Sequence, residues 1–150
     1  MPHDQDAPKP DQKISMWWAD SGRTILQARY PNRLHWPTIV AHVQEMWRWL
    51  DTVAHMVSFV LDVGQVRYFP PGYVEHVSKI EETMHPRVEL VVLMGSPLVW
   101  ELRTIYDEQF NERPHPFAYA DDLQMAYALI QQFRRGGSLG ALQPPKHISN

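Results

Sequence analysis

The chain has 150 residues, of which 44% are hydrophobic and 21% are charged. This length and composition predict one soluble globular domain and exclude an intrinsically disordered chain. The lack of cysteine excludes disulfide frameworks, thiolate metal sites and cysteine nucleophiles. A formal net charge of −3 disfavours nucleic acid as a partner. No apolar run approaches the roughly 20 residues of a membrane helix, so membrane insertion is not expected.

Polar, proline-containing segments flank the predicted domain. Residues 1–13 carry three prolines and no aromatic residue, and residues 136–150 carry three glycines and two prolines. Both segments are predicted to be disordered tails around a single domain at residues 14–135. The polar start shows no signal-peptide pattern, so a cytoplasmic location is expected.

Between the tails, apolar runs alternate with turn residues, so elements can be assigned in order. The predicted strands are at 14–18, 24–30, 57–62 and 88–94, with a short one around 117–119. The first predicted helix runs from 36 to about 54, and the second begins at Pro71 and ends at Pro86. The third is capped by Ser96, and the fourth follows Asp121. The order β-β-α-β-α-β-α-β-α predicts an α/β fold with a mixed, mostly parallel five-stranded sheet, whose first strand is an antiparallel edge.

Apolar residues at helical spacing indicate which helix faces point inward. In the helix after Gly72 they are Val74, Val77, Ile80 and Met84. In the helix after Ser96 they are Leu98, Leu102, Ile105 and Phe110. The last helix is expected to begin with a capping box over Asp121 to Gln124.

The central strands are apolar on both faces. Val57, Phe59 and Leu61 share one face, yet Val60 lies on the other, and residues 88–94 show the same pattern. Right-handed crossovers are expected to place the helices on one side of the sheet. The second face must then be covered by a helix that crosses over, by the edge hairpin or by a second subunit. Because two-fold dimers commonly bury such patches, a homodimer is predicted.

The tryptophans also indicate a surface role. Adjacent Trp17 and Trp18 must point to opposite faces of a strand, and Trp47 and Trp49 cannot both face the core squarely. At least one is expected to be exposed or buried by a partner. The alternative is that the indoles pack at the rim of the core.

The stretch from Phe59 to Gly72, FVLDVGQVRYFPPG, resembles the central region of STAS domains, the family of sulfate transporters and anti-sigma-factor antagonists. In that family a buried strand ends in Asp, and Asp-Ser-(Ser/Thr)-Gly opens the next helix. The resemblance implies a β–α superhelix over residues 14–135, with Asp62 at the strand end and Gly72 at the helix start. It also implies a regulatory role through contact with a protein partner.

The chain departs from the family pattern at the phosphorylated residue. Pro70 and Pro71 stand where the family has its phosphoacceptor, and no serine or threonine lies between Asp62 and Glu75. The family's phosphoserine switch therefore does not carry over.

The sequence predicts a non-catalytic regulatory protein-interaction module that docks through one edge of the sheet. The candidate docking residues are Asp62, Gly64, Gln65, Pro70, Pro71, Gly72, Gly95 and Ser96. The alternative is a small-molecule or anion-binding module at the same edge, because Gly95 and Ser96 lie where a strand ends and a helix begins. Ser96 can equally be an ordinary N-cap.

No catalytic residue, metal or cofactor is predicted. Glu82 and His85 match the Glu-x-x-His spacing of di-iron helices, but such sites need that motif twice. No Gly-x-Ser-x-Gly elbow is present. An enzyme is therefore the weakest of the three hypotheses.

Overall fold

The computed structural model describes residues 13–109 and 116–136. Its elements are β1 (Ser15–Trp18), β2 (Ile25–Arg29), α1 (Trp36–Leu50), β3 (Val57–Asp62), α2 (Tyr73–Glu82), β4 (Val88–Met94), α3 (Pro97–Gln109), β5 (Phe117–Ala120) and α4 (Leu123–Arg134). The predicted α/β class and the five-stranded, mostly parallel mixed sheet are confirmed. The tails predicted at 1–13 and 136–150 lie outside the described residues, except for their innermost positions.

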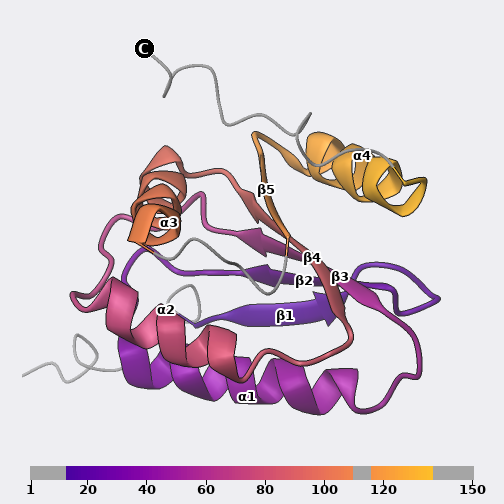
Figure 1. The fold of residues 1–150 in the computed structure, drawn as a ribbon, viewed down its shortest axis with the longest axis horizontal. Coiled ribbons are helices and arrows are strands. Elements are labelled where there is room, and N and C mark those ends of the chain that lie inside the picture. Colours follow the sequence, from indigo (N-terminus) through magenta and orange to yellow (C-terminus); the bar gives the residue numbers. More distant parts are fainter. Residues whose placement is uncertain (1–12, 110–115, 137–150) are drawn as a thin grey trace, which may run out of the picture.

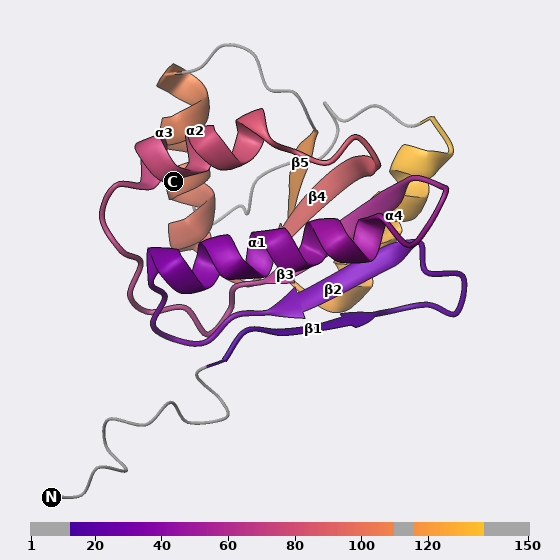
Figure 2. The same cartoon turned by 90° about the horizontal axis from the view of Figure 1, so that it is seen from below.

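The strands lie side by side in chain order, β1-β2-β3-β4-β5. β1 pairs antiparallel with β2, and the other pairs are parallel. α1, α2 and α3 each join one parallel strand to the next, so right-handed crossovers place all three on the same face. Figure 2 shows α1 crossing in front of the sheet with α2 and α3 beside it.

α4 covers the opposite face of the sheet, as Figure 1 shows. No strand follows α4 in the described residues, so the crossover rule does not constrain it. Ala118, Ala120 and Ala126 are fully buried between α4 and the sheet, and their small side chains let the helix approach closely. Of the three alternatives for covering this face, a crossing helix is the one observed. The apolar second face therefore no longer supports a homodimer.

Polar contacts fix α4 to the sheet. Arg134 donates to Glu89 Oε2 at 2.8 Å and to the Thr24 carbonyl at 2.8 Å, and Tyr127 donates to Gln27 Oε1 at 2.7 Å. The Tyr127 bond satisfies the buried Gln27 side chain, and the Arg134 bonds lie in an exposed position.

Several predicted boundaries need correction. α4 begins one residue later than the predicted capping box, because Asp122 is the N-cap and accepts a bond from Met125 N at 2.8 Å. α1 ends at Leu50 rather than near residue 54, where Asp51 N and Thr52 N bond back to the Trp47 and Trp49 carbonyls and close the last turn.

Five of the six tryptophans pack at the rim of the core: Trp18, Trp36, Trp47, Trp49 and Trp100. All six are half-buried, and none is exposed. Trp18 and Trp49 contact each other with ring centroids 5.7 Å apart, and both pack against the core on the α1 face. The expectation of an exposed tryptophan is therefore wrong, since long amphipathic rings can cover a core edge. Burial of a tryptophan by a partner stays a prediction.

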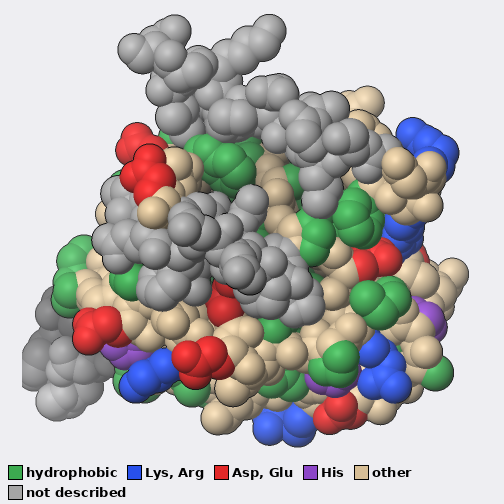
Figure 3. Space-filling model, viewed as in Figure 1, with side chains coloured by type: hydrophobic (Ala, Val, Ile, Leu, Met, Phe, Trp, Pro, Cys, Tyr) green, Lys and Arg blue, Asp and Glu red, His purple; other side chains and the backbone are tan. Residues whose placement is uncertain are grey.

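The large exposed apolar side chains in the described part of the chain are Val40, Met56, Tyr68 and Leu98. No helix in the described ranges is both long and apolar enough to cross a membrane. On the face shown in Figure 3, acidic and basic side chains are interspersed.

Candidate functional site

The predicted docking edge is only partly brought together. Gly64 and Gly95 meet where β3 and β4 end, and Gly64 N donates to Asp62 Oδ1 at 3.0 Å. Gly95 has φ +94°, and a Cβ there would lie 2.9 Å from the Cα of Gly64. Both the positive φ and the close backbone approach require glycine. Asp62 Oδ2 also accepts a hydrogen bond from Arg29 Nε at 3.4 Å. The Asp62 carboxylate therefore links the end of β2 to the loop that follows β3.

Ser96 follows Gly95 directly and caps the start of α3. Its side chain is buried, and its hydroxyl oxygen accepts from Val99 N at 3.5 Å in the first turn of α3. This matches the N-cap interpretation of Ser96.

Pro70, Pro71 and Gly72 form a separate group at the start of α2. Gly72 is the N-cap of α2 with φ +86°, and the Pro71 carbonyl accepts a hydrogen bond from Trp36 Nε1. The Trp36 ring stacks on His76, with centroids 4.3 Å apart. This group attaches α2 to the start of α1. Gln65 is exposed on the preceding loop.

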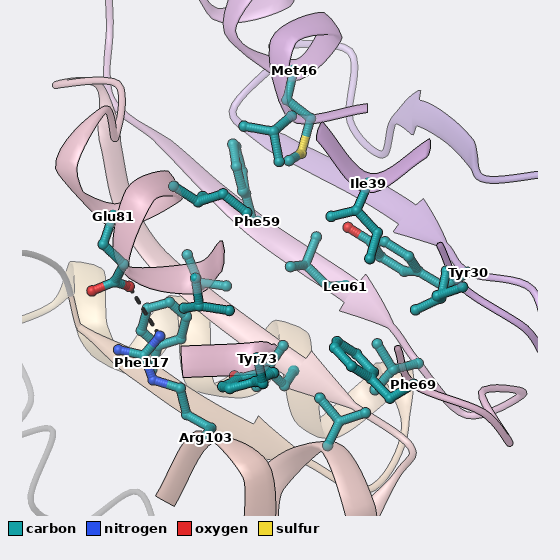
Figure 4. Close-up of a pocket in the computed structure, with 18 of the residues that line it drawn as sticks. Tyr30, Ile39, Met46, Phe59, Leu61, Phe69, Tyr73, Glu81, Arg103 and Phe117 are labelled. Atoms are coloured by element: carbon teal, nitrogen blue, oxygen red, sulfur yellow. Dashed lines mark hydrogen bonds and ion pairs between the residues drawn. The ribbon is translucent and has the colours of Figure 1, made fainter. Parts of the chain in front are cut away.

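A cavity of about 140 Å³ lies between the sheet and the helices of the first face. Figure 4 shows Glu81, Arg103 and Phe117 together at one end of it and Tyr30 and Ile39 toward the other. Its walls are mostly aliphatic and aromatic side chains from β3, β4, α1, α2, α3 and the loop that precedes α2. They include Ile39, Val43, Met46, Phe59, Leu61, Phe69, Val77, Ile80, Val91, Leu93 and Val99.

The cavity exists because α2 packs less closely than α4. Val77 and Ile80 line the cavity, yet both remain only half-buried, and Glu81 is the one buried residue of α2. Val77 and Ile80 on α2 line the cavity together with Leu61 and Leu93 of the sheet. A gap of this kind forfeits dispersion contacts on both walls, so a molecule that fills it restores them.

A buried ion pair forms the polar end of the cavity. Arg103 Nη1 donates to Glu81 Oε2 at 2.9 Å, and the two side chains are 2% and 5% exposed. The guanidinium carbon lies 3.6 Å from the centroid of the Phe117 ring, a cation–π contact. The Glu81 Oε1 atom is buried and accepts no hydrogen bond from any residue in the described ranges.

Burial shifts the pKa of two groups beside the cavity. It raises the pKa of the Tyr30 phenol above its ordinary value of 10. Burial lowers the pKa of His42 to about 4, and the nearby Glu45 carboxylate opposes this only in part. His42 contacts the Tyr30 ring edge-on, with centroids 5.2 Å apart. What the site offers chemically is therefore apolar surface and one ion pair.

The cavity and its ion pair were not predicted from the sequence. Leu98 was expected to point inward on α3, but Leu98 is 44% exposed and Arg103 is buried instead. The sequence does contain a pattern that indicates this ion pair. Glu81 falls on the apolar stripe of α2, four residues after Val77, and Arg103 falls four residues after the buried Val99. Opposite charges on the inward stripes of two neighbouring helices predict a buried pair.

His85 is fully engaged by protein groups. Its Nδ1 accepts from Arg87 N at 3.1 Å, so Nε2 carries the proton and donates to Asp51 Oδ1 at 2.8 Å. Within the residues that the structure describes, no group of His, Asp and Glu side chains is arranged to hold a metal ion.

No known protein family, curated protein or solved structure matches the chain.

Proposed function

We propose that the protein is a non-catalytic binding module that takes a small apolar ligand into the cavity beneath α2. The observation that carries this proposal is the cavity itself, about 140 Å³ in volume with almost entirely apolar walls. An apolar cavity of about 150 Å³ stays dry and takes up benzene or xenon, so the volume suits a molecule of about that size.

The position of the cavity beneath α2 would let a bound ligand change the surface that α2 presents. Its outer wall is α2, which begins at the Pro70–Gly72 group and contacts α1 through the Trp36–His76 stack. A ligand beneath α2 would contact Val77 and Ile80 directly. Binding would therefore stabilise α2 in its place and alter the surface that α2 presents.

A titration of the full chain with fluorobenzene tests this function. We expect saturable binding by calorimetry and a rise in melting temperature, since a ligand that binds only the folded state stabilises it. The variant Val77→Phe should abolish both effects, because the added ring fills the cavity from α2. The matched control is Val40→Phe on the exposed side of α1, where the side chain is 39% exposed, and it should bind as the wild type does. Equal binding by both variants would refute the assignment to the cavity.

A second candidate function is the regulatory protein interaction implied by the STAS resemblance. The observation that favours it is Tyr68, 46% exposed on the loop after Gln65, with the Arg33 guanidinium 5.1 Å from its ring centroid. Tyrosine and arginine are enriched among residues that dominate binding energy at interfaces. A protein partner that binds the wild type and Met56→Ala but not Tyr68→Ala would support this function. Unchanged binding by Tyr68→Ala would refute it for this surface.

A further inference from the structure

The polar end of the cavity identifies the chemical class of its ligand. Glu81 and Arg103 are buried in the cavity wall and pair through one carboxylate oxygen, Oε2. The other oxygen, Oε1, is shielded from solvent and receives no donor from the described residues. A buried carboxylate oxygen without a donor is costly, so a donor that reaches it gains an unusually favourable bond.

The charges of Glu81 and Arg103 also restrict the charge that a ligand can carry at this end of the cavity. The Glu81 carboxylate and the Arg103 guanidinium carry opposite charges and pair at 2.9 Å. A ligand carboxylate would meet Glu81 as a like charge, and a ligand ammonium would add an uncompensated charge in an apolar site. A neutral hydroxyl avoids both costs and forms a charge-assisted hydrogen bond.

We infer that the ligand is a neutral, benzene-sized apolar molecule with one hydroxyl donor, of the phenol class, whose hydroxyl bonds to Glu81. The inference rests on the proposed function, because it assumes that the cavity beneath α2 is a binding site. The ring occupies the space between Leu61, Leu93 and Val77, and the hydroxyl replaces the donor that Oε1 lacks.

Three probes of nearly equal size test the inference by calorimetry on the full chain. Phenol carries the donor, fluorobenzene has the same shape without it, and benzoate carries a negative charge. We expect phenol to bind at least about tenfold more tightly than fluorobenzene, as a hydrogen bond to a charged group implies, and benzoate not to bind. Equal affinity for phenol and fluorobenzene would overturn the hydroxyl assignment while leaving the proposed function intact. Binding by none of the probes would overturn both.

A double variant assigns the preference to Glu81. In Glu81→Met with Arg103→Met, apolar side chains of similar length replace the whole ion pair, a change that buried pairs often tolerate. The preference for phenol over fluorobenzene should fall to within about twofold, because no charged acceptor remains. A preference that persists in the folded double variant would overturn the role of Glu81. The wild-type comparison of the probes decides the hydroxyl assignment even if the variant does not fold.

Discussion

His42 should make the protein lose stability in mildly acidic solution. Its imidazole is 8% exposed on the inner side of α1, and burial holds its pKa at about 4 against an ordinary value of 6.5. The unfolded chain therefore binds a proton at a higher pH than the native protein. By linkage, the free energy of unfolding has its full value above about pH 6.5, where His42 is neutral in both states. It falls as the pH falls from 6.5 toward 4, because only the unfolded chain binds the proton there. The difference between the two pKa values corresponds to about 3 kcal/mol.

Urea unfolding from pH 7 to pH 4 measures this loss. The variant His42→Leu should be at least as stable as the wild type at pH 7, because no described residue bonds to His42 Nε2. Its free energy of unfolding should then fall by about 3 kcal/mol less than that of the wild type on acidification. As a control, Val40→Leu at an exposed position of α1 removes no titratable group and should retain the wild-type pH dependence. Parallel curves for the wild type and His42→Leu would refute the reasoning.

Three substitutions and one control variant test the packing of the strand ends and of α4 by urea unfolding. Gly95→Ala should destabilise by roughly 2 kcal/mol or more, since its φ of +94° and the neighbouring backbone at 2.9 Å leave no room for a Cβ. Gly22→Ala, where the nearest atom is 3.6 Å away, should change stability much less, and equal losses would contradict the steric argument. Tyr127→Phe should cost about 1–3 kcal/mol because the buried Gln27 oxygen loses its donor, and a neutral effect would show that another donor replaces it. Asp122→Ala should cost about 1 kcal/mol as a lost N-cap, whereas no change would mean that the cap bond is unimportant.

The strands could be predicted because local signals define them. Continuous apolar runs at 57–62 and 88–94 are bounded by proline, glycine and charged residues, and the structure places β3 and β4 over the same positions. The parallel pairing followed from the alternation with helices. Helix ends were less certain, since the end of α1 depends on turn bonds at Asp51 and Thr52 that periodicity does not reveal.

The face on which α4 lies could not be predicted from handedness. The crossover rule applies to a helix between two parallel strands, and no described strand follows α4. The apolar pattern of Val60 on the second face did show that something must cover it. Small residues in β5 and α4, such as Ala118 and Ala126, were the remaining clue that a helix of this chain does so.

The cavity could not be predicted because it depends on how closely α2 approaches the sheet. Periodicity showed that Val77 and Ile80 point inward, and they do line the cavity. It could not show how closely α2 approaches the sheet. The predicted edge residues Gly64 and Gly95 do meet, but as a close backbone packing.

Diffraction from crystals of the wild-type protein under xenon pressure would test the cavity beneath α2 most directly. An apolar space of about 140 Å³ should hold xenon, since engineered apolar cavities of about this size do so. We predict a xenon site between Val77 on α2 and Leu61 on β3, and its loss in crystals of Val77→Phe. A xenon-free interior, with α2 packed directly onto Leu61, would contradict the binding function proposed for this protein.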